Sequence, residues 1–174
     1  MKKVYEKNGF SYYEYKPTIF KPFYIEMETY SFRERIRFLL SYFVGYKVYY
    51  MMEGTKYIGY CVIEKSGNRR YKFIEKNDII VGPIFIKEEF RGRNLAGILN
   101  HVVLDDLGLK YNYAWNYVDK LNSKSIKAAP KAGFECVSDA VITGIGRKLV
   151  LVEEDTGDFR VMRYKNSENV LGNR

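Results

Sequence analysis

Cysteine and histidine are scarce in this sequence, which has two cysteines and one histidine among 174 residues. Cys61 and Cys136 lie far apart, and the chain has no CxxC pair and no grouping of cysteine with histidine. This pattern excludes the common zinc motifs, so we expect no metal site. Cys136 has no nearby base in the sequence and is expected to be a small buried apolar residue. Two separated thiols are typical of a reducing compartment and predict a cytoplasmic protein.

Long hydrophobic runs are also missing. The most apolar stretch near the front, FLLSYFVGY, is far shorter than the roughly 18 to 20 residues of a membrane-spanning helix. The first residues, MKKVYEKNGFSYYEYK, lack the apolar centre of a signal peptide. The sequence therefore predicts no membrane partner.

Aromatic and basic residues are abundant instead. The chain has 17 tyrosines and 11 phenylalanines, and its formal net charge is +8. A basic balance suits an anionic partner, such as nucleic acid, a phosphorylated cofactor or an acidic sugar, and charge alone does not choose among them. The positive residues are spread along the chain, whereas a nucleic-acid surface gathers them on one face, so we expect no nucleic-acid partner. The length predicts a single domain over residues 1–164, with an aromatic segment at 1–30 and a polar, flexible tail at 165–174.

Helix and strand patterns alternate along the chain. Ser31 and Glu34 form a capping-box signature for a helix, and its apolar residues fall at spacings of three and four, which predicts a core-facing side made of Phe32, Ile36, Leu39, Leu40 and Phe43. Strands are predicted at 46–53 and 56–65, joined as a hairpin by Gly54-Thr55, and at 78–86 and 111–118. Helices are predicted at about 94–108, with an apolar face of Leu95, Ile98, Leu99, Val102 and Val103, and at 122–132. Two or three strands follow, with a hairpin turn at 155–158. The class is α+β, with a mixed, mostly antiparallel sheet flanked by helices.

The predicted strand 78–86 contains Gly82-Pro83. Proline cannot donate a hydrogen bond to a sheet ladder, so this position predicts a bulge or a parting of neighbouring strands.

The loop after that strand leads into a helix and reads EEFRGRNLA. A helix start leaves backbone N–H groups without partners and carries a partial positive charge. Gly92 and Asn94 are residue types that tolerate positive φ, which aims successive N–H groups at one anion. Lys87, Arg91 and Arg93 add positive charge. From these residues alone, a phosphate site and an ordinary solvated turn both remain open.

Two phrases of the sequence resemble motifs of the GNAT-type N-acetyltransferases. Residues 91–96, Arg-Gly-Arg-Asn-Leu-Ala, are similar to the family's [Q/R]-x-x-G-x-[G/A] signature, with Asn94 in the usual glycine position. Downstream, Asn122, Ser125 and the Lys-Ala-Gly-Phe of 131–134 resemble the family's N-x-x-S…KxGF segment. The order of helices and strands over residues 30 to 145 is also that of the family.

The resemblance implies a fold with a splayed central strand pair and an acetyl-CoA site. It implies that the pyrophosphate is bound by the loop at the start of the helix, which we call the cradle and which consists of Arg91, Gly92, Arg93, Asn94, Leu95 and Ala96. It also implies that pantetheine contacts the strand backbone at Ile84, Phe85 and Ile86, with Asn122 and Ser125 near the CoA arm. For Ser125, a turn-capping role is an equal alternative.

The resemblance further implies direct attack of a primary amine on the acetyl thioester. The family's usual acid, a tyrosine seven residues after the asparagine, is replaced here by Ala129, so Tyr117, Tyr113 or a water takes that place in the hypothesis. Asp78 is the candidate base, with Glu75 as a second choice and a solvent-facing structural role as the alternative for both. The candidate catalytic residues are therefore Asp78, Asn122 and Tyr117.

The expected acceptor is a small-molecule amine. The tyrosine-rich first fifty residues lack an acidic cluster, which favours an amino sugar, a nucleotide-linked amino sugar or an amino acid over a polycation. The alternatives are a non-catalytic acyl-CoA-binding module of the same fold and, further off, a nucleic-acid-binding domain. The sequence leaves open whether the acyl group is longer than acetyl and whether the protein is a monomer or a homodimer.

Overall fold

The computed structural model describes residues 1–25, 31–144 and 146–166. The chain forms two compact units. Unit 1 contains Met1–Lys65 and Gly82–Asp106, and unit 2 contains Ser66–Val81 and the chain from Leu107 onward. Neither unit is one continuous stretch, so they are not successive domains. The strand β5 (Ile79–Ile86) begins in unit 2 and ends in unit 1.

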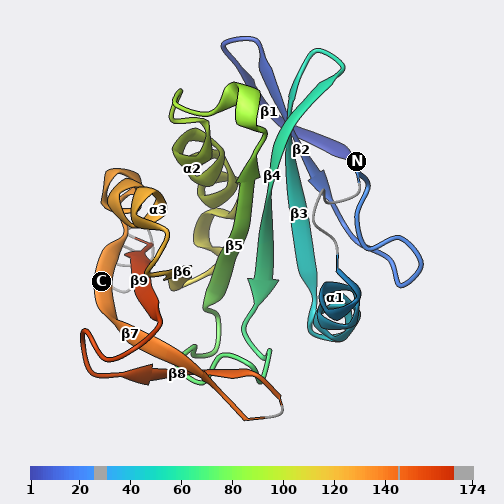
Figure 1. Ribbon diagram of the computed structural model, residues 1–174. Helices are drawn as coiled ribbons and strands as arrows, with labels where there is room; N and C mark the ends of the chain where they lie inside the picture. Colours follow the sequence, from blue (N-terminus) through green and yellow to red (C-terminus); the bar gives the residue numbers. More distant parts are fainter. Residues whose placement is uncertain (26–30, 145, 167–174) are drawn as a thin grey trace, which may run out of the picture. The chain divides into compact units, whose positions relative to one another are not determined.

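Unit 1 is built on antiparallel strands (Figure 1). They are β1 (Lys2–Lys7), β2 (Phe10–Tyr15), β3 (Tyr46–Glu53) and β4 (Lys56–Lys65), in that order, and the second half of β5 follows β4. The predicted hairpin of 46–53 and 56–65 is confirmed. The close approach of β5 to β4 requires a glycine, because a Cβ at Gly59 would lie 2.2 Å from the Phe85 carbonyl oxygen.

The helices of unit 1 are α1 (Phe32–Val44) and α2 (Leu95–Leu107). The predicted capping box of α1 is confirmed, since the Ser31 side chain accepts from the Glu34 N–H and the Glu34 carboxylate accepts from the Ser31 N–H. On α2, four residues of the predicted apolar face are buried, Leu95, Leu99, Val102 and Val103, whereas the fifth, Ile98, is 40% exposed.

The predicted core face of α1 is wrong. Its five residues are exposed, with Phe32 at 76% and Phe43 at 74%, whereas Phe38 and Ser41 are buried. The opposite side of the helix is held by a polar contact, because Arg37 Nη2 donates to Glu64 Oε1 at 2.6 Å and Ser41 Oγ to Glu64 Oε2 at 3.0 Å. A buried carboxylate on β4 therefore decided which side of α1 faces inward, and periodicity alone could not show this.

Unit 2 contains the first half of β5 and four further strands, in the order β5-β6-β9-β7-β8. They are β6 (Tyr113–Asp119), β7 (Glu135–Thr143), β8 (Lys148–Val152) and β9 (Phe159–Lys165), with the short helix α3 (Ser123–Ala128). Among the described strands of this unit, β5 and β6 pair parallel and the other neighbouring strands pair antiparallel. The pairing of β5 with β6 is limited to Ile79–Ala114 and Ile80–Trp115 among the described residues, so the ladder stops before Gly82-Pro83, as predicted. The α+β class with a mixed, mostly antiparallel sheet is confirmed.

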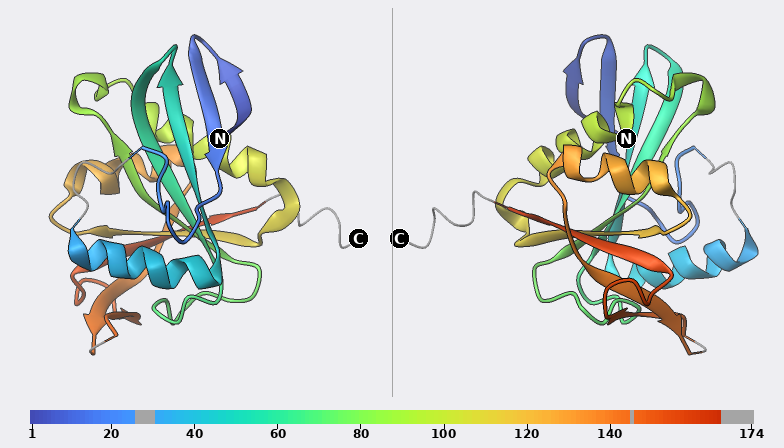
Figure 2. Two further views of the ribbon diagram at one scale, coloured as in Figure 1. Left: turned by 90° about the vertical axis from the view of Figure 1, so that its right-hand side faces the viewer. Right: turned by 60° about the vertical axis from the view of Figure 1, so that its left-hand side comes forward.

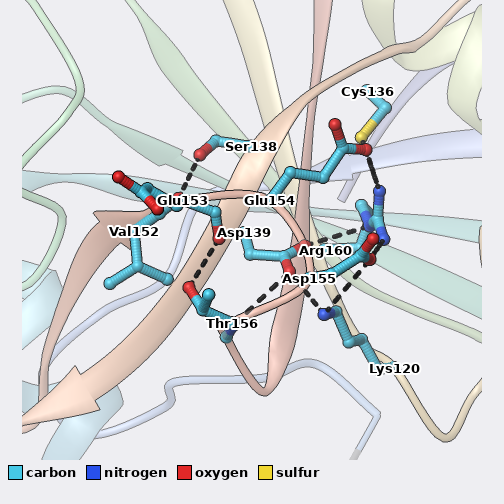
Figure 3. A network of polar contacts seen from close by, with 11 residues as sticks. Lys120, Cys136, Ser138, Asp139, Val152, Glu153, Glu154, Asp155, Thr156 and Arg160 are labelled. Atoms are coloured by element: carbon cyan, nitrogen blue, oxygen red, sulfur yellow. Dashed lines mark hydrogen bonds and ion pairs between the residues drawn. The ribbon is translucent and has the colours of Figure 1, made fainter.

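The predicted hairpin at 155–158 is wrong. The turn exists, but β9 does not return along β8; it lies between β6 and β7. The turn is fixed to β7 instead, because the Gly157 N–H lies 3.4 Å from Asp139 Oδ2 and a Cβ at Gly157 would meet the Ala140 backbone at 2.6 Å. Figure 3 shows Asp139 enclosed by Lys120 and Arg160 beside this turn.

Two smaller expectations concern the C-terminal part. Cys136 was expected to be buried and is exposed, with its sulfur 3.4 Å from Arg160 Nη1. Of the predicted flexible tail, Lys165 ends β9 and Asn166 is buried, where its side chain donates to the carbonyls of Gly108 and Tyr111. Residues 167–174 lie outside the described residues.

Candidate functional site

The loop between β5 and α2 contains the predicted cradle, residues 91–96, and lies in unit 1. A single 3₁₀ turn, Glu88–Phe90, buries Phe90 and leads into Arg91. Gly92 then has φ +83° and Asn94 has φ +55°. The positive φ predicted for these two residues is therefore confirmed. Asn94 stands at the entry of α2, because its carbonyl accepts the N–H of Ile98 at 3.1 Å.

Contacts inside unit 1 hold the cradle in place. Arg91 Nε donates to the Ile86 carbonyl at 3.0 Å and its guanidinium lies 5.9 Å from the Phe85 ring, so Arg91 joins the loop to β5. A Cβ at Gly97 would lie 2.8 Å from Asn94 Oδ1, which means that the Asn94 side chain occupies the space that a side chain at position 97 would need. Sequence reasoning missed Gly97, although a glycine three residues after an asparagine at a helix start was a visible signal.

The charge around the cradle is mixed, with a positive side. Arg91 and Arg93 are exposed at its mouth, and Arg93 lies 5.7 Å from the Phe10 ring. Glu88 and Glu89 precede them in the 3₁₀ turn. The α2 helix has no acidic residue in its first turn, so its partial positive end is not neutralised from within. The arrangement suits an anion of the size of a phosphate group.

The strand that leads into the cradle supplies the other predicted cofactor contacts. Ile84 and Phe85 are half-buried and Ile86 is buried. The Phe85 ring stacks on Tyr60 at a centroid distance of 5.6 Å. All nine predicted cofactor-binding residues from Ile84 to Ala96 therefore belong to one compact unit. Asp78, Tyr117, Asn122 and Ser125 belong to unit 2.

Asp78 has the surroundings of a structural carboxylate. It is 2% exposed, and it accepts from the Trp115 side chain at 2.8 Å, from the Glu75 N–H at 3.1 Å and from the Tyr113 N–H at 3.2 Å. Both carboxylate oxygens of Asp78 already accept hydrogen bonds. The geometry therefore favours a structural role, in which Asp78 fixes β6 to the start of β5, over a role as the base that takes a proton from a substrate.

Replacement of Asp78 by asparagine separates these two roles. In Asp78→Asn, the side-chain NH2 group would replace one oxygen and face an N–H donor, so at least one hydrogen bond would be lost. The variant is therefore expected to be less stable by about 2 kcal/mol. The folded variant should retain its affinity for CoA and, for an active amine, most of its kcat. Chemical denaturation and steady-state rates measured well below the variant's Tm check both effects. A fall in kcat of about 100-fold or more with unchanged stability would return the base role to Asp78.

Asn122 and Ser125 lie at the start of α3. Asn122 caps the helix, with its Oδ1 accepting from the Ser125 N–H at 3.1 Å. Both residues are exposed. Ala129, in place of the family's tyrosine, ends the helix, and its N–H donates to the Ser125 carbonyl.

Tyr117 lies on β6 in an aromatic group of unit 2. Its ring centroid is 5.8 Å from those of both Tyr71 and Phe159. The residue is half-buried.

Among the described residues, no group of three or more His, Cys, Asp and Glu side chains is arranged to hold a metal ion. Within those same residues, no helix is long and apolar enough to cross a membrane.

Comparison with solved structures places this fold among known ones. The chain is similar to a GNAT family acetyltransferase from Elizabethkingia anophelis with acetyl-CoA bound, at a TM-score of 0.61 and 13% identity, covering 91% of this chain and 99% of the other. It is also similar to a putative GNAT acetyltransferase from Desulfovibrio desulfuricans, at a TM-score of 0.58 and 11% identity, covering 80% and 86%.

A spermidine N-acetyltransferase from Vibrio cholerae matches at a TM-score of 0.51 and 16% identity, covering 74% of this chain and 70% of that one. No protein-family model and no curated protein sequence matches the chain. The structural similarities show that the chain has the GNAT acetyltransferase fold.

Proposed function

We propose, from the GNAT fold and the cradle at the start of α2, that this protein is an N-acetyltransferase that moves an acetyl group from acetyl-CoA to a primary amine of a small molecule. The observation that carries the proposal is the pair of positive φ angles at Gly92 and Asn94 in front of α2. Such a turn directs successive N–H groups toward one anion at the positive end of a helix. Two of the similar solved structures, those from Elizabethkingia anophelis and Salmonella typhimurium, contain acetyl-CoA.

The geometry of unit 1 supports the proposed binding roles. The backbone N–H groups of the cradle would hold the pyrophosphate, with Arg91 and Arg93 adding positive charge. The Ile84–Ile86 backbone, which lies beyond the last β5–β6 pair at Ile80–Trp115, would hold the pantetheine arm as an added strand does. Acetyl-CoA supplies an activated thioester, and a backbone N–H near Ile84 would polarise its carbonyl.

The proposed catalytic roles lie with residues of unit 2. Direct attack by a neutral amine needs alignment and a path for protons more than it needs a nucleophilic side chain. We assign Asn122 to a polar contact through its amide nitrogen, because its Oδ1 is used by the helix cap. Tyr117 is the proposed acid in place of the tyrosine that Ala129 replaces. Asp78 is the candidate base, and the Asp78→Asn variant tests whether it has this role.

The proposed acceptor is an amino sugar, a nucleotide-linked amino sugar or an amino acid. The net charge of +8 suits an acceptor with an anionic group and disfavours a polycation. One similar structure is a spermidine acetyltransferase, but its sequence identity to this chain is only 16%. This similarity therefore does not indicate that spermidine is the acceptor of this protein. The unpaired cysteines fit a cytoplasmic setting.

Release of free thiol from acetyl-CoA across a panel of amines tests this function. An acetyltransferase is expected to release one thiol for each amine consumed, with product mass increased by one acetyl group. Binding of CoA without turnover on any amine would favour the non-catalytic module. Salt-sensitive binding of random oligonucleotides without binding of CoA would overturn the proposal and indicate a nucleic-acid-binding domain.

A further inference from the structure

The outward face of α1 carries a continuous apolar stripe. We define the α1 stripe as the exposed side chains of Phe32, Ile36, Leu39, Leu40 and Phe43. An apolar stripe on a helix of a globular protein normally faces the core. Here all five side chains are exposed to solvent. In the left view of Figure 2, α1 is the blue helix on the viewer's side of the sheet of unit 1. Exposed apolar patches of this kind mark interaction surfaces.

The orientation of α1 is fixed, so the stripe cannot turn inward at low cost. Phe38, on the inner side, packs edge-on against Phe23 at 4.8 Å and contacts Tyr46 at 5.4 Å. The Arg37–Glu64 ion pair and the Ser41–Glu64 hydrogen bond lie on the same inner side. Rotation of the helix would break an ion pair whose carboxylate is 1% exposed, and the unpaired buried charge would be costly.

The spacing of the stripe is symmetric. Phe32, Ile36, Leu39 and Phe43 are separated by four, three and four residues, which is the spacing of a helix–helix seam. Read in either direction, the seam has an aromatic residue at each end and two branched aliphatic residues between them. In a two-fold interface residue i contacts residue j of the partner and residue j contacts residue i, so a seam with this symmetry pairs side chains of the same kind. An antiparallel pair would place Phe32 opposite Phe43 of the partner and Ile36 opposite its Leu39.

The charges along α1 also favour an antiparallel pair. Every charged residue of the helix lies between positions 33 and 37, and none lies between 38 and 44. Three of them are arginines, of which Arg37 is paired with Glu64 on the inner side. The last turn has no basic residue, so the partial negative charge of the helix C-terminus is not offset there. An antiparallel pair brings the arginine-rich half of each helix beside the uncharged C-terminal half of the other, whereas a parallel pair would bring the arginines together.

The apolar surface extends beyond the helix. Ile19 and Phe20 line a hollow of about 340 Å³ together with Leu39 and Tyr42, and Phe20 is 96% exposed. Three exposed phenylalanines, at positions 20, 32 and 43, each present on the order of 150 Å². They supply about half of the 800 Å² that each partner of a stable interface buries, and the aliphatic side chains supply most of the remainder.

We propose that the α1 stripe is the interface of a homodimer in which two copies of α1 pack antiparallel about a two-fold axis. The hollow beside the seam receives side chains of the partner. The dimer does not depend on the acetyltransferase proposal, because the experiment that tests it measures the mass of the protein in solution.

Sedimentation velocity of the full chain tests the dimer. The expected mass is 41 kDa, twice the 20.5 kDa of one chain, at micromolar concentration. Phe43→Asp places a carboxylate in the seam and is expected to weaken association by about 100-fold or more, giving a folded monomer. Leu121→Asp, at a residue that is 93% exposed in unit 2, is the matched control and should stay dimeric.

Cross-linking tests the antiparallel arrangement. With Cys136→Ser to remove the exposed thiol, a mixture of Phe32→Cys and Phe43→Cys chains should form disulfides between the two variants, and neither variant should do so alone. Cross-links within a single variant would overturn the antiparallel pairing. A wild-type monomer at about 100 μM, a Phe43→Asp dimer, or a monomer that binds anionic vesicles through the stripe would each overturn the dimer.

Discussion

Replacement of Gly92 by proline is expected to abolish the thermal stabilisation of this protein by CoA. The backbone at Gly92 has φ +83°, whereas proline holds φ near −65° and removes the N–H that would point at the pyrophosphate. Wild-type protein at 100 times the Kd should gain about 2.7 kcal/mol, which is a rise in Tm of about 5 to 10 °C for a chain of this size. The variant should lose at least about 100-fold in affinity, so the shift should fall to about 1 °C or less. Differential scanning fluorimetry measures it directly.

Matched variants separate the cradle from a general loss of folding. A Cβ at Gly92 would meet nothing within 4 Å, so Gly92→Ala should carry only the cost of positive φ and keep part of the shift. Asn94→Gly should bind CoA as well as wild type, whereas Asn94→Val should bind about tenfold more weakly, because a β-branched residue resists φ +55°. Arg91→Ala should also weaken binding, and Lys124→Ala should not. An unchanged CoA shift in Gly92→Pro would exclude the cradle as the phosphate site.

Removal of the Asp139 carboxylate is expected to cause the largest loss of stability in unit 2. Asp139 is fully buried, forms an ion pair with Lys120, and lies 3.0 Å from Arg160 Nε (Figure 3). It also accepts from the Gly157 N–H, which fixes the turn between β8 and β9 to β7. Asp139→Ala would remove the only buried carboxylate that Lys120 and Arg160 are shown to pair with among the described residues and leave them the exposed Glu154 and Asp155, so it should lower the free energy of unfolding by about 3 kcal/mol. Urea denaturation followed by circular dichroism measures this loss.

An exposed ion pair in the same unit is the control. Arg163 and Glu135 pair at 2.8 Å, but the Glu135 side chain is 62% exposed. Glu135→Ala should change stability by less than about 1 kcal/mol. Equal losses in the two variants would show that burial of Asp139 does not matter.

The same carboxylate should make stability depend on pH. Burial alone would raise the pKa of Asp139, but the hydrogen bonds from Lys120 and the Gly157 N–H and the charge of Arg160 outweigh it, so its pKa lies below the ordinary value. The unfolded chain therefore binds this proton more tightly. The stabilisation is fully present above the unfolded pKa of about 3.9 and is lost as pH falls through the folded pKa. The difference in unfolding free energy between wild type and Asp139→Ala should shrink below about pH 4.

The sequence predicted the parts of the fold that depend on neighbouring residues. The hairpin of β3 and β4 follows from alternation around Gly54-Thr55, and the capping box of α1 follows from Ser31 and Glu34. The cradle was also readable, because Gly92 and Asn94 are the residue types that positive φ favours and the structure has positive φ at both. Each of these features is set by interactions within a few residues.

Three features could not be read in this way. The side of α1 that faces inward was decided by Glu64, which lies 27 residues from Arg37 in the chain. The place of β9 between β6 and β7 was decided by pairing partners rather than by the turn at 155–158. The buried state of Asp78 depends on Trp115 and Tyr113, some 35 residues later.

The sequence by itself therefore determined the α+β class, the approximate positions of the three α-helices and of β3 to β6, and the local shape of the loop that begins α2, because hydrogen bonding and φ preferences act over short distances along the chain. The strands β1 and β2 lie in the segment predicted only as aromatic and were not predicted. Only the tertiary structure decided which carboxylates are buried, which strands pair and which side of α1 is left outside. These outcomes depend on the few polar groups that find partners far away in the sequence. A buried charge must be paired wherever its partner lies, and this requirement outweighed the apolar periodicity of α1.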